Sequence, residues 1–264
     1  LPPWLDAVIQ VHPTVVDAAI GNELSAELED TDEKHASLLQ EISNTSTPIV
    51  SFFLPRIRTW LKAVLADQDT AVAGMDKVGR AITLLLEHGL AEDAADVLDV
   101  GRMRLQGTPD PSETKFWLPI LARLNPAECV DTMERLAGAI PPAKHSVVVD
   151  WIAALFGNNG SEADLSRFET QPDLLLRLAR IANRHVRFVD DLNHEGVHSM
   201  GTRDYAERGR SVLGNRLLGA KGAGAWEMKM QFANDPDVVH FQDRIRAVAL
   251  EQLAEDWDTV ILAE

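Results

Sequence analysis

Residues 194–198, with the sequence His-Glu-Gly-Val-His, match the zinc-binding pattern H-E-x-x-H. In this pattern two histidines one helical turn apart bind zinc, and the glutamate between them acts as a general base. Downstream of the motif, Asp204 follows Gly201 at the spacing expected of a third zinc ligand. Taken alone, the motif predicts a zinc metalloprotease with the ligands and base His194, His198, Asp204 and Glu195.

The sequence around this motif differs from that of a buried catalytic helix. Asp190, Asp191 and Asn193 precede it and are typical of a helix end, and Gly196 and Ser199 suit a loop. A glycine inside a helix costs about 1 kcal/mol relative to alanine. Such proteases also align the substrate along a sheet edge, and no segment of this chain has the alternating pattern of a strand. We therefore interpret residues 190–201 as a polar loop, and expect no catalytic residue, no metal and no cofactor.

Helical periodicity dominates the rest of the chain, with apolar residues recurring at steps of three and four between proline and glycine breaks. Pro55 lies inside one apolar segment and should kink that helix or mark its start. The run 147–149 could be a strand, although its flanks have a helical pattern. The expected helices cover residues 4–11, 13–28, 49–66, 71–87, 91–105, 112–124, 126–138, 142–157, a short segment after 161, 172–189, 204–218, 224–233 and 238–257.

Because every expected element is a helix, the sequence predicts an all-α fold. The helices are short, amphipathic and often paired. Helix starts at residues 71 and 112 have a spacing close to the ~40-residue period of HEAT repeats, but the next start near 142 breaks it. We expect an irregular HEAT-like helical-hairpin solenoid, with an irregular bundle as the alternative. We expect one domain over residues 1–264, with a sub-boundary near residues 157–172. Because the chain begins with Leu1 rather than methionine, it is expected to be a fragment of a longer protein.

The net charge of −16 argues against binding to nucleic acid or to an anionic membrane, because both need a basic surface. No apolar run has transmembrane length. Cys129 is the single cysteine, so neither an internal disulfide nor a cysteine zinc cluster can form. These features fit a cytoplasmic protein.

A cluster of arginines stands out against this acidic background. Residues 174–221 carry nine Lys or Arg and five Asp or Glu. Four of the arginines recur at steps of three and four, so they should line one helical face. They either pair with acidic neighbouring helices, or are solvated, or form a docking surface for an acidic partner or phosphate. The candidate partner-binding residues are Arg177, Arg180, Arg184, Arg187, Arg203 and Arg208.

The region from His185 onward, together with residues 3–39, resembles the C-terminal helical-repeat part of large bacterial NACHT-type STAND NTPases. The residues that carry the resemblance are Asp190-Asp191, His194-Glu195-Gly196-Val197, Arg203-Asp204, Ala206-Glu207-Arg208, Leu213, Leu217-Leu218, Gly222, Ala225 and Ala233-Asn234-Asp235-Pro236. The resemblance implies a missing N-terminal effector and P-loop ATPase, and a repeat region that senses a ligand. Some of these proteins act in antiphage defence. It also implies that the His-Glu-Gly-Val stretch is a recurring loop feature.

Three functions therefore remain open. The first is a noncatalytic, cytoplasmic recognition or sensor module that binds a protein partner or other domains of its parent protein. The second is the zinc metalloprotease, and the third is a purely structural scaffold. Bound metal separates the second from the others, and recovery of a specific partner separates the first from the third.

Overall fold

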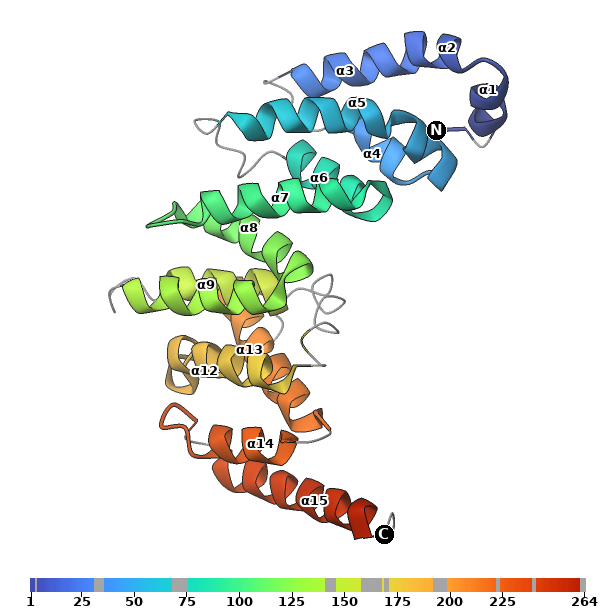
Figure 1. Cartoon of the computed structure of the whole chain (residues 1–264). Helices are drawn as coiled ribbons and strands as arrows, with labels where there is room; N and C mark the ends of the chain where they lie inside the picture. Colours follow the sequence, from blue (N-terminus) through green and yellow to red (C-terminus); the bar gives the residue numbers. More distant parts are fainter. Residues whose placement is uncertain are drawn as a thin grey trace. The chain divides into compact units, whose positions relative to one another are not determined.

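The computed structural model describes the chain except residues 3, 31–35, 68–75, 141–145, 158–167, 169–170, 192–198, 222–223, 239–240 and 262–264, and the side chains of residues 255–261. Every regular element within the described part is helical (Figure 1). The all-α prediction is therefore confirmed. Contacts divide the chain into two compact units, Leu1–Phe116 and Trp117–Glu264.

The first unit consists of helices that pack against near neighbours in the chain: α3 on α4, α4 and α5 on α6, and α6 on α7. This serial packing is typical of helical-hairpin arrays; the HEAT-like period stays a prediction. The elements are α1 (Leu5–Val11), α2 (Pro13–Val16), the π-helix η1 (Asp17–Gly21), α3 (Asn22–Glu29), α4 (Ser37–Ser43), α5 (Thr47–Ala66), α6 (Asp76–His88) and α7 (Ala91–Arg104).

Charged side chains join these helices at their ends. The Lys77 ammonium group of α6 donates hydrogen bonds to the backbone oxygens of Leu28 and Asp30, at the C-terminal end of α3. The Glu27 carboxylate accepts hydrogen bonds from the backbone N–H groups of Leu38 and Leu39, at 2.8 and 2.9 Å, and so caps α4. Both contacts satisfy backbone groups that a helix end leaves unpaired, and both place charge favourably for the helix dipoles.

The second unit is built around α12, which α9, α10, α13 and α14 contact. The division of the chain into the two units falls within the helix α8 (Pro111–Leu124). The remaining elements are α9 (Pro126–Ala139), α10 (Ser146–Ile152), the π-helix η3 (Ala153–Gly157), α12 (Pro172–His185), the 3₁₀-helix η5 (Phe188–Asp190), α13 (Thr202–Gly219), α14 (Ala225–Ala233) and α15 (Gln242–Ile261).

Two glycines allow α13 to lie directly against α10 and η3. A Cβ atom at Gly157 would overlap the backbone of Tyr205 on α13. A Cβ atom at Gly209 would lie 2.9 Å from the carbonyl oxygen of Ile152 and 3.2 Å from the Cβ of Phe156. Such contacts are too close for any residue with a side chain, so this pair of glycines sets the separation of the two segments.

Several helix boundaries differ from the predictions. Pro55 does not mark a helix start, because α5 begins at Thr47 with Pro48 in its first turn, and the exposed Pro55 lies inside it. The run 147–149 is part of α10 and not a strand. The helix expected over residues 172–189 ends at His185. The predicted sub-boundary near residues 157–172 lies mostly outside the described residues and stays a prediction.

Candidate functional site

The arginine row lies mainly on α12, whose other side is largely apolar. Pro172 begins this helix, and its leucines, alanines and Ile181 are buried. Arg177, Arg180 and Arg184 are on the side that faces away from this core and are partly exposed. The predicted helical face is therefore present for three arginines. Arg187 follows the end of the helix, so the expectation that it extends the row along the same face is wrong.

Arg177 connects α12 to α9. Its guanidinium donates hydrogen bonds to both carboxylate oxygens of Glu134, through Nε at 2.9 Å and through Nη2, and to Asp131 at 2.6 Å. The bonds to Glu134 and then Asp131 raise the pKa of Arg177 above its ordinary value. This arginine is thus fully charged, and two carboxylates of the neighbouring helix already occupy its donors.

Arg180 and Arg184 pair with the segment between α14 and α15. Nε of Arg180 donates to Asp235 at 3.0 Å, and Nε of Arg184 donates to Asp237 at 3.1 Å. The two pairs differ in exposure. The side chain of Asp235 is 7% exposed, whereas that of Arg184 is 63% exposed. The first pair is therefore the more desolvated, and the second retains donors that face solvent.

The other predicted arginines lie in different surroundings. Arg187 donates to both carboxylate oxygens of Asp190, at 2.9 and 3.0 Å. Arg203, on α13, donates to Glu207 and Asp191 at 3.2 Å and to the backbone oxygen of Arg187 at 2.7 Å. Arg208 is also on α13, about 140° around the helix axis from Arg203. The six candidates therefore do not share one surface.

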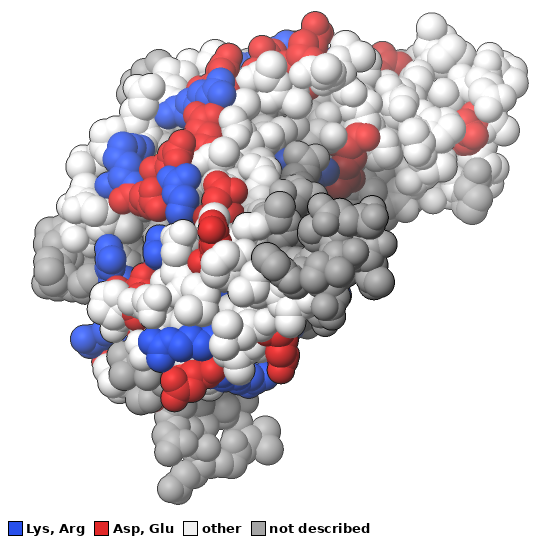
Figure 2. Space-filling view, turned by 60° about the horizontal axis from the view of Figure 1, so that its bottom comes forward, with Lys and Arg blue, Asp and Glu red and all other residues white. Residues whose placement is uncertain are grey.

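A hollow of about 380 Å³ lies between α9 and α12, where three of these arginines meet. Its apolar part comes from Ala137, Ile140 and Ile181. Figure 2 shows the charged side chains of one face of the molecule, where Lys and Arg lie beside Asp and Glu. The hollow has the same mixed character, because Glu134 lines it together with Arg177, Arg180 and Arg184. We name this hollow the α9–α12 groove.

The acidic partners of the arginine row are functional candidates that sequence reasoning missed. Asp235 and Asp237 are more than 50 positions away from the arginines that they bind. From the sequence, Asp235 could be recognised only as part of a break between two helices, and nothing indicated that it pairs with an arginine. The sequence indicates the acidic partners on α9 more clearly, because Asp131 and Glu134 have the same three-residue spacing as Arg177 and Arg180.

His194, Glu195 and His198 lie outside the described residues, so the geometry of the zinc motif is untested. The third predicted ligand, Asp204, is in the first turn of α13. Its carboxylate accepts a hydrogen bond of 2.7 Å from the backbone N–H of Gly201. This contact caps the helix, and it gives the side chain a structural role without any metal.

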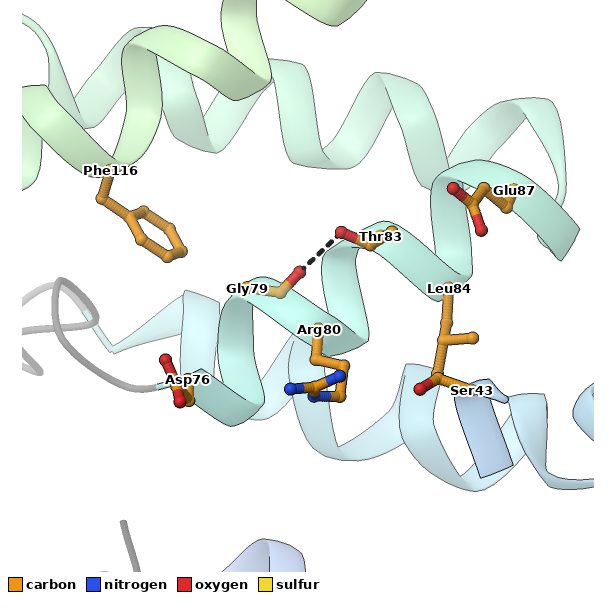
Figure 3. Close-up of a pocket in the computed structure, with 8 residues that line it drawn as sticks. All are labelled: Ser43, Asp76, Gly79, Arg80, Thr83, Leu84, Glu87 and Phe116. Carbon is orange, nitrogen blue, oxygen red and sulfur yellow. Dashed lines mark hydrogen bonds between the residues drawn. The ribbon is translucent and has the colours of Figure 1, made fainter. Parts of the chain in front are cut away.

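A second hollow, of about 500 Å³, lies in the first unit along α6 (Figure 3). Gly79 and Thr83 of α6 line it together with Ser43 of α4 and Phe116 of α8. The hydroxyl of Thr83 donates to the Gly79 backbone oxygen at 3.0 Å. Arg80 extends from the same helix and has no hydrogen bond or ion pair within the described part of the chain. This hollow is open and has both polar and apolar residues in its lining, and none of the predicted site residues is among them.

No described helix has the length and apolar character needed to cross a membrane. The parts of the chain with described side chains also contain no cluster of three or more His, Cys, Asp or Glu residues placed to hold a metal ion.

No protein-family model matches this sequence, and neither the curated proteins nor the solved structures contain a significant match to it.

Proposed function

We propose that this chain is a noncatalytic recognition module that binds an acidic segment of a protein partner in the α9–α12 groove. The proposal rests on one observation: three arginines of one helical face line a hollow that also has an apolar surface. A groove of this kind can take a peptide that carries carboxylates next to an apolar side chain.

Arg184 is the residue best placed to bind such a partner. Its side chain is 63% exposed and its pair with Asp237 is a single bond of 3.1 Å. A guanidinium group has five N–H donors, so one bond to Asp237 leaves others for a second carboxylate. Exposed ion pairs contribute only about 0–1 kcal/mol, so rearranging this pair on binding costs little.

We further propose that the module belongs to a longer cytoplasmic NACHT-type STAND NTPase of bacteria, with a role in signalling such as antiphage defence. The resemblance of residues 185–236 and 3–39 to the helical-repeat region of those proteins supports this. The full-length reading frame is the test. A P-loop motif, G-x-x-x-x-G-K-[ST], upstream of this region would support the assignment, and a reading frame without one would contradict it.

Peptide binding tests the groove directly. Peptides enriched on the purified chain from a displayed random library should contain Asp or Glu next to an apolar residue. Fluorescence anisotropy should show that Arg184→Glu weakens binding of these peptides about tenfold or more, equivalent to ~1.4 kcal/mol. Added salt should weaken the wild-type complex more than any residual binding by the variant.

Two controls separate docking from internal pairing. Arg246→Glu alters another arginine that is paired on its own helix, with Asp243 at 3.2 Å, and should leave peptide affinity unchanged. The double variant Arg184→Asp with Asp237→Arg keeps an ion pair between the two positions. It moves the guanidinium from α12 to the segment between α14 and α15. Loss of binding in this swap supports docking at position 184. Full binding by Arg184→Glu would refute the proposed groove.

A further inference from the structure

A separate hollow of about 200 Å³ lies in the second unit, where the end of α12, η5, α13, α14 and the start of α15 meet. Its walls are largely apolar. Two of its rings form an aromatic pair, with the Phe188 and Phe241 centroids 5.2 Å apart. The apolar side chains that line it are Phe188, Leu218, Phe232, Val238, Phe241 and Ile245.

Two buried polar side chains also line this hollow, and each has an atom without a partner. Asn183 is 5% exposed; its Nδ2 donates to the backbone oxygen of Ala179 at 2.7 Å, while its Oδ1 accepts no hydrogen bond within the described part of the chain. Arg210 is 4% exposed, and its Nε is buried without an acceptor. A buried donor without an acceptor is unfavourable, and of these two atoms only Nε of Arg210 is fully buried, whereas Oδ1 of Asn183 can accept a hydrogen bond from the hollow.

The rest of the Arg210 guanidinium is held firmly in place. Nη1 and Nη2 donate to the two carboxylate oxygens of Asp191, at 2.9 and 2.6 Å, and Nη1 also donates to the backbone oxygen of Val186. Its central carbon lies 3.6 Å from the centroid of the Phe188 ring. Arg210 is therefore a rigid part of the wall, and its Nε–H and second Nη2–H have no acceptor within the described part of the chain.

Arg244 adds a positive charge to the same hollow. It is exposed on α15, lines the hollow, and has no hydrogen bond or ion pair within the described part of the chain. Arg246, two positions later, instead binds Asp243 and Asn234 at 3.2 Å. An arginine without a partner among the described residues is available to bind an anionic group.

We propose that this hollow binds the C-terminal residue of a peptide chain whose last side chain is apolar. Such a residue matches the lining of the hollow: its carboxylate suits the Arg244 guanidinium, its backbone N–H suits Oδ1 of Asn183, and its apolar side chain suits the aromatic walls. The hollow is also small. Its volume of about 200 Å³ is below the ~300 Å³ lower bound of ordinary small-molecule sites, so it suits a small group such as a single residue. This site shares no lining residue with the α9–α12 groove.

The test compares fluorescent peptides that differ only at their C-terminus, measured by anisotropy on the full chain. A peptide that ends in leucine or phenylalanine with a free carboxylate should bind. Its C-terminal amide, and a version ending in lysine, should bind at least about tenfold more weakly, because the amide has no charge to pair with Arg244 and a lysine side chain places a charge against the apolar walls. Arg244→Gln should reduce affinity for the free acid by a similar factor and have no effect on the amide.

Arg246→Gln is the matched control, because it removes a paired arginine from the same helix, and it should bind the free acid normally. Phe241→Ala should weaken binding of both the acid and the amide, because it removes part of the apolar wall. Arg184→Glu should have no effect, which separates this site from the α9–α12 groove.

Three results would overturn the proposal. The first is equal binding of acid and amide, or of wild type and Arg244→Gln. The second is the absence of binding by any of the peptides. The third is competition by N-acetyl-leucine as strong as that by the whole peptide, which would indicate a small carboxylate ligand in place of a chain terminus.

Discussion

Arg58 of α5 and Asp93 of α7 form two parallel hydrogen bonds, from Nε at 2.7 Å and from Nη2 at 2.8 Å. The Asp93 side chain is 1% exposed, and it also accepts a 2.8 Å bond from the backbone N–H of Leu90. This carboxylate thus joins α7 to α5 and also caps the start of α7. Removal of the Asp93 carboxylate should strongly destabilise the protein, because it leaves the Arg58 guanidinium, whose side chain is only 23% exposed, without its partner.

This pair predicts a specific loss of stability in acid. Burial raises the pKa of Asp93, but the hydrogen bonds from Arg58 and Leu90 lower it further, to a net value below the ordinary 3.8. The stabilisation is therefore present above pH 3.8 and is lost as the pH falls through the lower, folded-state value. Asp93→Asn should cost about 3 kcal/mol at pH 7, a difference that shrinks as the pH falls below 3.8.

Urea unfolding of wild type and Asp93→Asn at several pH values measures this difference. Asp96→Asn is the control, because its pair with Lys62 is about half exposed on both sides and should contribute less than about 1 kcal/mol. If the difference between wild type and Asp93→Asn stayed constant down to pH 3, the proposed linkage would be wrong.

The close approach of α13 to α10 predicts opposite effects for two glycines of one helix. Gly209→Ala places a methyl group 2.9 Å from the backbone oxygen of Ile152, so it should destabilise by roughly 1–3 kcal/mol. Gly214→Ala meets no atom within 4 Å and should stabilise by about 0.5–1 kcal/mol, because alanine favours the helix. Thermal melting measures both. A Gly209→Ala variant as stable as wild type would show that the two segments can move apart without cost.

Periodicity was sufficient to predict most helices, because long amphipathic segments such as α12 contain several apolar residues at helical spacing. It missed α4, a seven-residue helix whose start is capped by Glu27 from another helix. It could not decide the role of Pro55, because a proline on the exposed side of α5 leaves the buried apolar face intact. The local sequence does not reveal that Glu27 caps α4 or that Pro55 lies on the exposed side of α5.

For the candidate site, the sequence predicted the shared face of three arginines but not the residues that bind them. The spacing of Arg177, Arg180 and Arg184 identified a common face, because a helix repeats every 3.6 residues. The carboxylates that bind the last two come from residues 235 and 237, which only tertiary folding brings near. Arg210 gave no sequence signal at all, since its role depends on burial against Phe188.

We predict that the purified chain contains no stoichiometric zinc. The motif at residues 194–198 is polar and interrupted by Gly196, and the carboxylate of its third ligand already caps α13 at Gly201. Elemental analysis after dialysis is the measurement, with His194→Ala as the comparison. About one zinc per chain in wild type, lost in His194→Ala, would contradict the prediction and restore the protease hypothesis.

Charge reversal at two arginines of α12 should separate structure from docking. Arg180→Glu places a carboxylate beside the largely buried Asp235, and should cost about 2 kcal/mol or more in unfolding free energy. Arg184→Glu faces a more exposed Asp237 and should cost less than about 1 kcal/mol. Denaturant unfolding of the two variants provides the comparison, and equal costs would show that burial does not distinguish the pairs. Because Arg184→Glu is expected to keep the fold, a loss of peptide binding in that variant reports on docking, whereas the same loss in Arg180→Glu combines docking with instability.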